Sequence, residues 1–414
     1  MPTATIVGMT DAADTAWLLV STGLVMLMTP GLALFYGGMV QAKNVLSTFM
    51  HSFFALGLVS VQFAAIGYSL AFGPTHHGVI GGFDLAGLAG IDETATSGGV
   101  PTLAVVGYQC MFAVITPALI SGAFAERMTF GAFAIFTLLW TTLVYDPIAH
   151  WTWADHGWLH DLGVIDYAGG TVVHLSSGVS ALVVALVLGK RRGYPAVRHA
   201  PHDLPMTVLG AGLLWFGWFG FNAGSAGANG MGALALLNTH LAAAAGALAW
   251  ALVEALRVRK VTMLGVASGL VAGLVAITPA AGYVSPMAAL GLGAVAGLVC
   301  YGAVLAKSKL GYDDALDAFG VHGIGGATGA LLTGLLARGA LNKGVGGGLT
   351  LLGKQAIGVA AAGAWAAVVT FVLLKIIARF VALRVEPEVE YEGLDTALHG
   401  ESAYATPGTA LHES

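Results

Sequence analysis

Apolar runs of about 20 residues, separated by short polar loops, extend along almost the whole chain. A helix needs roughly that length to cross the hydrocarbon core of a bilayer. The runs predict eleven spans, at residues 14–36, 44–72, 99–124, 130–150, 167–189, 204–222, 233–254, 261–280, 284–305, 315–337 and 349–382. We therefore predict an all-α polytopic membrane protein with eleven transmembrane helices.

Basic residues gather in the loops on one side of these spans. That side holds Lys43, Arg127, Lys190, Arg191, Arg192, Arg198, Arg257, Arg259, Lys260, Lys307, Lys309, Arg379 and Arg384. The loops on the other side hold Arg338 and Lys343. Lysine and arginine mark cytoplasmic loops, so we expect the first side to face the cytoplasm, with the N-terminus outside and the C-terminus inside. Residues 1–382 would then form the transmembrane domain, and residues 383–414 a polar, acidic cytoplasmic tail.

Composition excludes a soluble protein and argues against nucleic acid and metal ions as partners. The chain is 57% hydrophobic and 9% charged, with a mean hydropathy of +0.81, whereas soluble domains carry about 25% charged residues. A net charge of −5 gives no indication of nucleic-acid binding. Cys110 and Cys300 both lie inside apolar runs, which predicts buried free thiols and neither a disulfide framework nor a metal site. The first residues lack the basic and short apolar regions of a cleavable signal peptide.

Two histidines, His174 and His322, lie within apolar runs of the predicted spans. An ionisable side chain at that depth is costly, so a function is its default interpretation. With a rise of about 1.5 Å per residue, each lies roughly 10 Å into its span, from opposite faces of the membrane. An aspartate precedes each histidine, Asp166 and Asp317. Similar sequences at matched depth in antiparallel helices indicate an inverted repeat. We predict repeat halves at 14–189 and 204–337, with the helix at 349–382 extra.

The histidines are also compatible with other interpretations. Either could be a buried residue bonded to a neighbouring carbonyl, although two at matched positions make this less convincing. Gly224-Ser225-Ala226-Gly227 resembles the surroundings of the nucleophile in intramembrane serine proteases. However, Ser225 is expected at the outer end of span six, far from the histidines. A bis-histidine haem site is disfavoured because each helix carries one such histidine and no second pair.

Seven segments resemble the ammonium transporter family (Amt/Mep/Rh), and most closely its prokaryotic Amt members. They are PGLALFYGGMVQAKNVLS, ITPALISGAFAERM, DPIAHWTW, DYAGGTVVH, WFGWFGFNAGSAG, DAFGVHGIGG and EGLDTALHGESAY. The resemblance runs nearly end to end, and DYAGGTVVH together with FNAGSA is highly specific. It implies a homotrimer in the cytoplasmic membrane, with a pore in each subunit that conducts ammonium or ammonia; the sequence leaves the tolerance of methylammonium open. It implies no enzyme activity and no cofactor.

The resemblance also assigns roles to individual residues. His174 and His322 would be the twin pore histidines, with Trp218 as a pore-lining aromatic residue. An outer recruitment site would comprise Trp153, Ser225, Phe112 and the supporting carboxylate of Asp166, and a stacked gate would comprise Phe112 and Phe221. The chain departs from the family pattern in two places. The loop between Trp153 and Asp166 is about one residue longer, and Tyr108 stands where phenylalanine is common.

These residue types suit the transport of ammonium on physical grounds. A small cation is attracted to an aromatic face by about 0.5–2 kcal/mol, most strongly to tryptophan. Ser225 offers a hydroxyl acceptor for an N–H group, and Asp166 can cap the start of span five. A cation is costly at mid-membrane while a neutral amine is not. Two neutral imidazoles present both a donor and an acceptor, and such a pair can take up or relay a proton.

The sequence leaves regulation and net charge movement open. A Rh-like ammonia gas channel and an ammonium sensor are alternatives within the same family. The resemblance implies that a PII-type signalling protein docks on the cytoplasmic face. We expect the tail to lie across that face, with its glutamates near the basic loops (Glu386, Glu388, Glu390 and Glu392 with Lys190, Arg191, Arg192, Arg257, Arg259 and Lys260).

Overall fold

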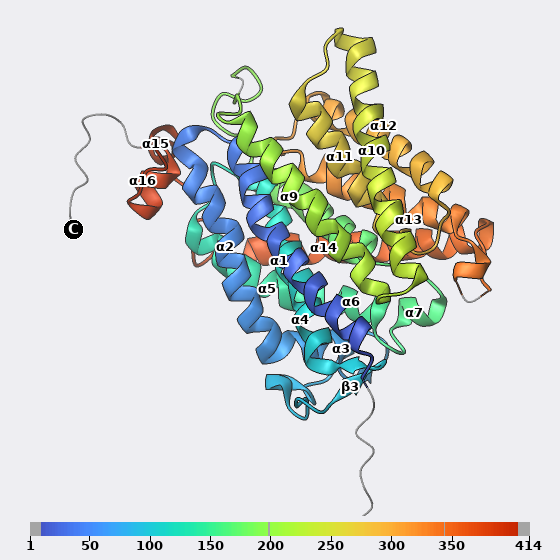
Figure 1. Ribbon diagram of the computed structural model, residues 1–414. Coiled ribbons are helices and arrows are strands. Elements are labelled where there is room, and N and C mark those ends of the chain that lie inside the picture. Colours follow the sequence, from blue (N-terminus) through green and yellow to red (C-terminus); the bar gives the residue numbers. More distant parts are fainter. Residues whose placement is uncertain (1–9, 198, 343, 405–414) are drawn as a thin grey trace, which may run out of the picture.

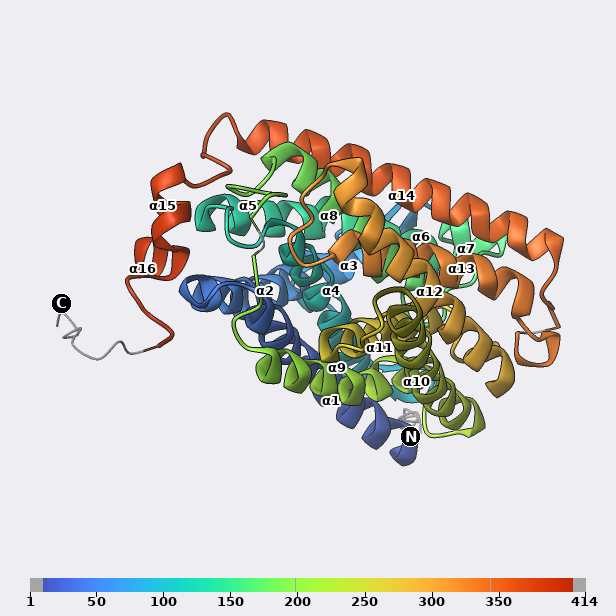
Figure 2. The same cartoon turned by 90° about the horizontal axis from the view of Figure 1, so that it is seen from above.

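The structure, a computed structural model, describes residues 10–404 apart from residues 198 and 343 (Figure 1). The predicted loop charges Arg198 and Lys343, the start of the chain at residues 1–9 and the end of the tail at residues 405–414 lie outside the described residues. In the rest of the chain, long helices pack side by side into one bundle. Figure 2 shows α14 along one edge of this bundle, and α1, α9 and α10 along the opposite edge.

Helices account for nearly all regular structure in the described residues. The first half of the chain contains α1 (Ala12–Met39), α2 (Val45–Gln62), α3 (Tyr68–Phe72), α4 (Thr102–Phe124), α5 (Phe130–Trp140), α6 (Asp146–Trp153), α7 (Trp158–Leu162) and α8 (Ser176–Leu188). The second half contains α9 (Leu204–Ala223), α10 (Gly230–Val258), α11 (Met263–Ile277), α12 (Pro286–Leu310), α13 (Ile324–Leu336), α14 (Leu349–Ile377), α15 (Pro387–Glu392) and α16 (Leu394–His399).

Shorter elements join or interrupt these helices. Two antiparallel hairpins lie between α3 and α4, one from β1 (Thr75–His76) and β2 (Ile80–Gly81), the other from β3 (Thr96–Ser97) and β4 (Val100–Pro101). Single 3₁₀ turns are η1 (Ala42–Asn44), η3 (Ala86–Leu88), η6 (Gly224–Ala226) and η8 (Gly339–Leu341). Wider π-helical turns are η2 (Phe63–Gly67), η4 (Thr141–Tyr145), η5 (Gly170–Leu175) and η7 (Phe319–Gly323).

Ten continuous helical segments in the described residues are long and apolar enough to cross a membrane. They correspond to ten of the predicted spans. The remaining predicted span, 261–280, contains α11, which has 15 residues. At about 1.5 Å per residue this is shorter than the roughly 30 Å of a hydrocarbon core. Structure and prediction therefore agree on an all-helical polytopic protein. Whether it has eleven membrane-spanning helices depends on whether the short helix α11 crosses the membrane.

The π-helical turns place both predicted pore histidines. His174 lies in η5, which leads into α8, and His322 lies in η7, which leads into α13. A π turn inserts an extra residue into a helix and occurs frequently at functional sites. Two segments related by the predicted repeat thus share the same local distortion at the same residue type. Hydropathy indicated the helices but carries no sign of these turns.

Small residues allow the central helices to approach each other closely. A Cβ atom on Gly210 of α9 would collide with the backbone of α1 at Phe35 and Gly31. In the second half, Gly273 of α11 and Gly293 of α12 both lie against the backbone of α10 at Ala242. Close backbone packing of this kind holds helices together where lipid removes the hydrophobic drive between them.

The bundle has two chemically different ends. We name the first the Trp153 end; it carries the start of α1, both hairpins and α7. We name the second the Arg191 end; it carries the loop after α8 and the C-terminal helices α15 and α16 (Figure 1). These two helices are packed onto the bundle: Leu394 is buried, and the Asp395 carboxylate accepts hydrogen bonds from the first amides of α2, Leu46 N and Ser47 N, at 3.0 and 2.8 Å.

The tail contacts the bundle with different partners from those expected. Of the four glutamates, Glu390 makes an ion pair, with Arg384, and its carboxylate also accepts from the backbone N–H of Arg192. Arg191, expected to face the tail, is buried and pairs with Glu126 and Asp313. Charge patterning located the right surface, but it did not distinguish a free loop arginine from one buried within the bundle.

Candidate functional site

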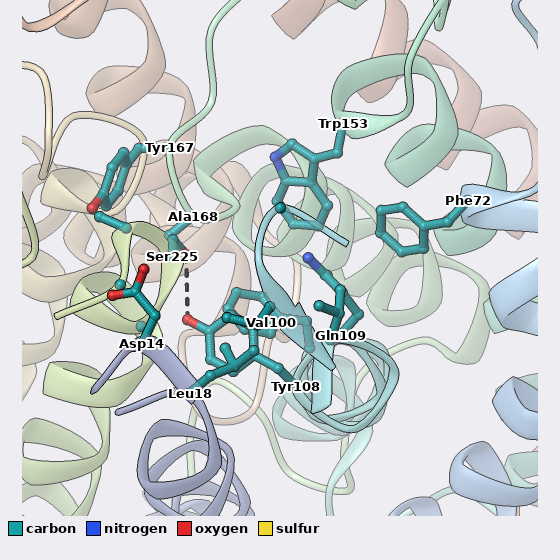
Figure 3. Close-up of a pocket in the computed structure, with 16 residues that line it drawn as sticks. Asp14, Leu18, Phe72, Val100, Tyr108, Gln109, Trp153, Tyr167, Ala168 and Ser225 are labelled. Carbon is teal, nitrogen blue, oxygen red and sulfur yellow. Dashed lines mark hydrogen bonds between the residues drawn. The ribbon is translucent and has the colours of Figure 1, made fainter. Parts of the chain in front are cut away.

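A cavity of about 390 Å³ opens at the Trp153 end (Figure 3). Its lining brings together three of the predicted recruitment residues, Phe112 of α4, Trp153 of α6 and Ser225 of η6. Tyr108, Gln109 and Tyr167 also line it. The predicted recruitment residues are thus gathered from elements far apart in the sequence, with the exception of Asp166, which lies behind the cavity wall.

Aromatic rings form part of the lining of this cavity. The rings of Phe112 and Trp153 meet edge to face, with centroids 6.0 Å apart and planes at 89°. The indole N–H of Trp153 donates to the carbonyl oxygen of Asp166 at 2.9 Å, which fixes the orientation of the ring. A small cation in this cavity can therefore contact aromatic faces whose positions are held by the backbone.

Ser225 is held so that its oxygen can accept a further hydrogen bond. The Tyr108 hydroxyl donates to the carbonyl oxygen of Phe221 (2.7 Å), with that of Gly220 close by at 2.9 Å. Because this hydroxyl has one proton, it acts towards Ser225 Oγ, 3.2 Å away, as an acceptor. Ser225 then donates to Tyr108 or to Phe221 O and keeps lone pairs for a ligand N–H. The sequence shows Tyr108 as a departure from the family pattern but gives no sign of its contact with Ser225.

Phe112 and Phe221 separate this cavity from the interior. Their rings are stacked, with centroids 4.1 Å apart and planes at 25°, and the two side chains are 1% and 0% exposed. Phe112 lines the cavity at the Trp153 end, and Phe221 lines the space around the histidines. The pair therefore forms a closed partition at the position predicted for a gate.

The two predicted pore histidines are in direct contact. The Nδ1 atoms of His174 and His322 lie 3.3 Å apart, with ring centroids at 5.3 Å and planes at 23°. Both side chains are buried, at 1% and 3% exposure. For this contact to be a hydrogen bond, one Nδ1 must carry a proton and the other must accept it. The matched depth inferred from the sequence thus corresponds to a pair of rings that share one hydrogen bond.

The space beside the histidines is narrow and apolar. Trp218 stacks on His174 with centroids 5.2 Å apart, and its indole N–H donates to Thr278 Oγ1 at 2.8 Å. The remaining walls come mainly from aliphatic and aromatic side chains, which are Met28, Leu32, Phe35, Ile115, Leu119, Leu214, Phe221 and Val271. Walls of this kind favour a neutral molecule over an ion.

Asp166 supports the start of η5 through its backbone. Its carboxylate accepts four amide hydrogen bonds, from Gly169 N (2.9 Å), Gly170 N (2.7 Å), Thr171 N (2.8 Å) and Val172 N (3.0 Å). The first backbone N–H groups of a helix have no carbonyl partner within the helix, and a carboxylate satisfies them well. Asp166 therefore positions the segment that carries His174, and it fixes the carbonyl that binds Trp153.

The counterpart of Asp166 in the second half is Asp314. Its carboxylate accepts from Ala318 N (3.1 Å) and Phe319 N (2.8 Å) at the start of η7. Asp317, which the sequence had suggested as the matching aspartate, instead forms an ion pair with Lys307 at the Arg191 end. Of the three aspartates close together there, only Asp314 stands eight residues before its histidine, as Asp166 does, so the prediction of Asp317 was wrong and the hydrogen bonds identify Asp314.

A second opening lies beyond the histidines. His322 also lines a small space with Tyr36, Ser268 and Asp317. Asp317 in turn lines a cavity of about 430 Å³ at the Arg191 end, together with Lys307 and Tyr194. Cavities thus lie on both sides of the phenylalanine and histidine pairs.

A buried ion network stabilises the Arg191 end. The Arg191 guanidinium donates to Glu126 Oε2 at 2.8 Å and to both Asp313 carboxylate oxygens at 2.8 and 2.9 Å. Burial alone raises the pKa of the Glu126 carboxyl, but Arg191 and the amides of Gln41 and Asn44 outweigh this and hold the pKa below its usual value. Burial likewise raises the pKa of Asp313, and its bonds to Arg191 more than compensate, so that this pKa is also lowered.

A family model described as Ammonium Transporter Family matches residues 16–404 of this sequence. The chain belongs to this family. An ammonium transporter of Bacillus subtilis (strain 168) is 52% identical to this transporter over 400 residues, covering 94% of this chain and 98% of the relative. Ammonium transporter Amt1 of Archaeoglobus fulgidus is 44% identical over 395 residues, covering 94% and 99%.

Solved structures agree with this assignment. The crystal structure of Saccharomyces cerevisiae Mep2 superposes with a TM-score of 0.86 at 38% identity, covering 92% of this chain and 89% of that one. A structure named Sensor Amt Protein gives a TM-score of 0.88 at 29% identity, covering 94% and 98%. The predictions of an ammonium transporter, of a multi-pass membrane protein and of the absence of enzyme activity are therefore confirmed. The serine-protease interpretation of Ser225 is set aside.

Proposed function

We propose that this transporter binds ammonium in the cavity at the Trp153 end, admits it past the Phe112–Phe221 gate, and conducts ammonia along a pore lined by His174 and His322. The observation that carries the proposal is the contact between the two histidines, placed between two cavities and behind a closed aromatic pair. Membership of the family makes ammonium the substrate. The route through the protein is our inference.

Recruitment rests on the contents of the first cavity. Trp153 and Phe112 present aromatic faces, and Ser225 presents an oxygen with lone pairs available. An ammonium ion has four N–H donors and a compact charge, so it can use both kinds of contact at once. Asp166 contributes by fixing the geometry, because its carboxylate is fully occupied with backbone amides.

Passage then requires the two phenylalanines to move and the ammonium ion to lose its proton before it enters the apolar pore. The stacked phenylalanines have to rotate for any molecule to pass. Beyond them, the apolar walls around Trp218 disfavour an intact cation. The histidine pair can accept a proton from ammonium or transfer it, while the neutral amine moves along the pore. The narrow space favours a small neutral solute.

The placement in the membrane is also part of the proposal. The equivalent positions of Asp166 and Asp314 and of His174 and His322 support an inverted repeat, with α11 as the eleventh span. The Trp153 end and the N-terminus would lie outside, and the Arg191 end and the tail from residue 383 would face the cytoplasm, as the basic loops indicate. A homotrimer in the cytoplasmic membrane and a docked PII-type protein remain proposals drawn from the resemblance.

Reconstitution of the pure protein into liposomes tests this function. A pulse of ammonium should evoke a membrane current, a change in internal pH, or both, depending on whether charge crosses. The His174→Ala/His322→Ala protein, reconstituted at the same density, is the matched control. Equal responses from wild-type liposomes and from protein-free liposomes would exclude transport by this chain under these conditions.

A further inference from the structure

Asp14 contributes the charged side chain among the described residues that line the cavity at the Trp153 end. It lies in the first turn of α1 and is partly exposed. In Figure 3, Asp14, Ser225 and Tyr167 gather on one side of the cavity, and Gln109 and Trp153 lie on the other. None of the residues predicted for the site from the sequence supplies a free carboxylate there, because the Asp166 carboxylate is saturated by amides.

Asp14 is held in place through one of its two oxygens. Oδ1 accepts a hydrogen bond of 2.7 Å from the backbone N–H of Ala228, three residues after Ser225. Asp14 thereby ties the loop that carries Ser225 to the start of α1. The other oxygen, Oδ2, receives no hydrogen bond from the described residues and remains free for a ligand in the cavity.

Two neutral oxygens of lining residues also lack partners. Gln109 Oε1 and the Tyr167 hydroxyl have no hydrogen bond in the described part of the chain, and almost none of their surface is open to solvent. Buried polar atoms are normally satisfied, so each unsatisfied one needs a reason. A rotation of these side chains towards the cavity would let a small cation with several N–H donors supply the missing bonds, while its charge neutralises the carboxylate.

We infer that Asp14, with Tyr167 beside it, forms a first binding station, which takes a small monovalent cation with N–H donors before it reaches Trp153 and Phe112. Gln109 lies across the cavity beside Trp153 and would bind the cation at the following step. A carboxylate in a cleft with low-dielectric walls raises the local concentration of cations. Because Asp14 is only partly buried, a cation bound there keeps part of its water. The inference rests on the proposed function, since it adds a step before recruitment.

Asp14 also has structural roles that a test must separate from this one. A carboxylate in the first turn stabilises α1 through the helix dipole, and Oδ1 holds Ala228. Asp14→Asn keeps an oxygen for Ala228, removes the charge and replaces the other carboxylate oxygen by an N–H donor. Asp14→Ala removes both the oxygen for Ala228 and the charge. Glu93→Gln is the matched control, because Glu93 is an exposed acid at the same end of the bundle that does not line the cavity.

The experiment measures ammonium transport by the full-length protein in liposomes, as current and as internal pH, over a range of ammonium concentrations. It is done at low ionic strength (about 10 mM) and high ionic strength (about 300 mM), because salt screens a charge that is open to solvent. At low ionic strength, Asp14→Asn should raise KM about three- to tenfold with an unchanged maximal rate. High ionic strength should reduce that difference. Tyr167→Phe should raise KM at both ionic strengths, since it removes a neutral acceptor.

The outcomes distinguish this inference from the proposed function. A wild-type KM for folded Asp14→Asn at low ionic strength would overturn the station, as would an equal rise in KM for Glu93→Gln. Thermal melting of each purified variant establishes that it is folded, and Asp14→Asn retains the backbone bond that folding needs. If the wild-type protein transports no ammonium, the proposed function fails. If the wild-type protein transports ammonium and Asp14→Asn has the same KM at low ionic strength, only the inference about the station fails.

Discussion

Asp166 and Asp314 occupy the same position relative to His174 and His322, since each stands eight residues before its histidine. Both carboxylates bind backbone amides at the start of a π-helical turn, η5 in one case and η7 in the other. The two turns run in opposite directions in the proposed topology, and their histidines meet at 3.3 Å. The geometry of the histidine pair therefore depends on two buried caps.

Asp166→Ala should impair both folding and transport. It leaves four buried amides without their acceptor, and each such loss costs about 1–3 kcal/mol. Asp166→Asn keeps one oxygen acceptor and should fall between Asp166→Ala and the wild type. Thermal melting in detergent and ammonium-evoked responses in liposomes measure the two effects. Wild-type melting and transport by Asp166→Ala would show that the carboxylate is not a cap.

Replacing both His174 and His322 by alanine should remove selective transport. The pore then loses its donor and acceptor, so it either stops conducting or becomes an unselective cation leak. Ammonium-evoked and potassium-evoked currents recorded on the same liposomes distinguish these results. If the double variant keeps the wild-type rate and selectivity, the assignment of the pore to these histidines is wrong.

Trp153→Ala should raise the KM for ammonium about two- to thirtyfold, because an aromatic face contributes about 0.5–2 kcal/mol to binding a small cation. Trp153→Phe keeps a face but loses the N–H bond to Asp166 O, so its KM should rise less. Concentration series in liposomes provide both values. A KM for Trp153→Ala equal to that of the wild type would remove Trp153 from the recruitment site.

Acidification should weaken the Arg191 end before the rest of the protein. Contact with Arg191 lowers the pKa of Glu126 and Asp313 below their values in the unfolded chain. Their contribution is therefore present above the ordinary carboxyl pKa of about 4, and it is lost as the pH falls towards the lowered values. Melting temperatures of the wild type and of Arg191→Met, measured as a function of pH, test this expectation.

In Arg191→Met the buried carboxylates lose their partner, a change that costs about 3–5 kcal/mol in comparable cases. The variant should melt at a lower temperature at neutral pH and should lose less stability on acidification than the wild type. If the melting temperatures of the two proteins fall by the same amount across the acidic range, the role given to the network is contradicted.

Truncation after Arg384 should change transport activity and weaken docking of a PII-type protein. It removes Leu394, which is buried, and Asp395, which caps α2. Flux in liposomes and PII binding to the purified protein are the measurements, and size-exclusion chromatography checks that the assembly is intact. Asp395→Asn is the milder control, because it perturbs the cap and leaves the rest of the tail in place. Wild-type flux and PII affinity after truncation would exclude the regulatory role.

Much of this architecture could be predicted because its signals are local. Apolar runs of membrane-spanning length mark the helices, and two histidines in such runs stand out against their surroundings. The π turns could not be predicted, because their extra residue leaves no trace in hydropathy. Nor could the burial of Arg191, since it depends on hydrogen bonds between segments far apart in the sequence. The choice of Asp314 over Asp317 could have been predicted, because Asp314 has the same eight-residue spacing from its histidine as Asp166.

The aromatic stack has a consequence for the energy supply of the cell. Phe112 and Phe221 lie at a ring separation of 4.1 Å, and the space beside the histidines, about 10 Å³, has room for roughly one water molecule. A continuous file of water through a membrane would conduct protons and discharge the proton-motive force. An apolar constriction with room for about one water molecule cannot hold such a file, so a channel of this kind would let nitrogen enter while the proton gradient that drives ATP synthesis is kept.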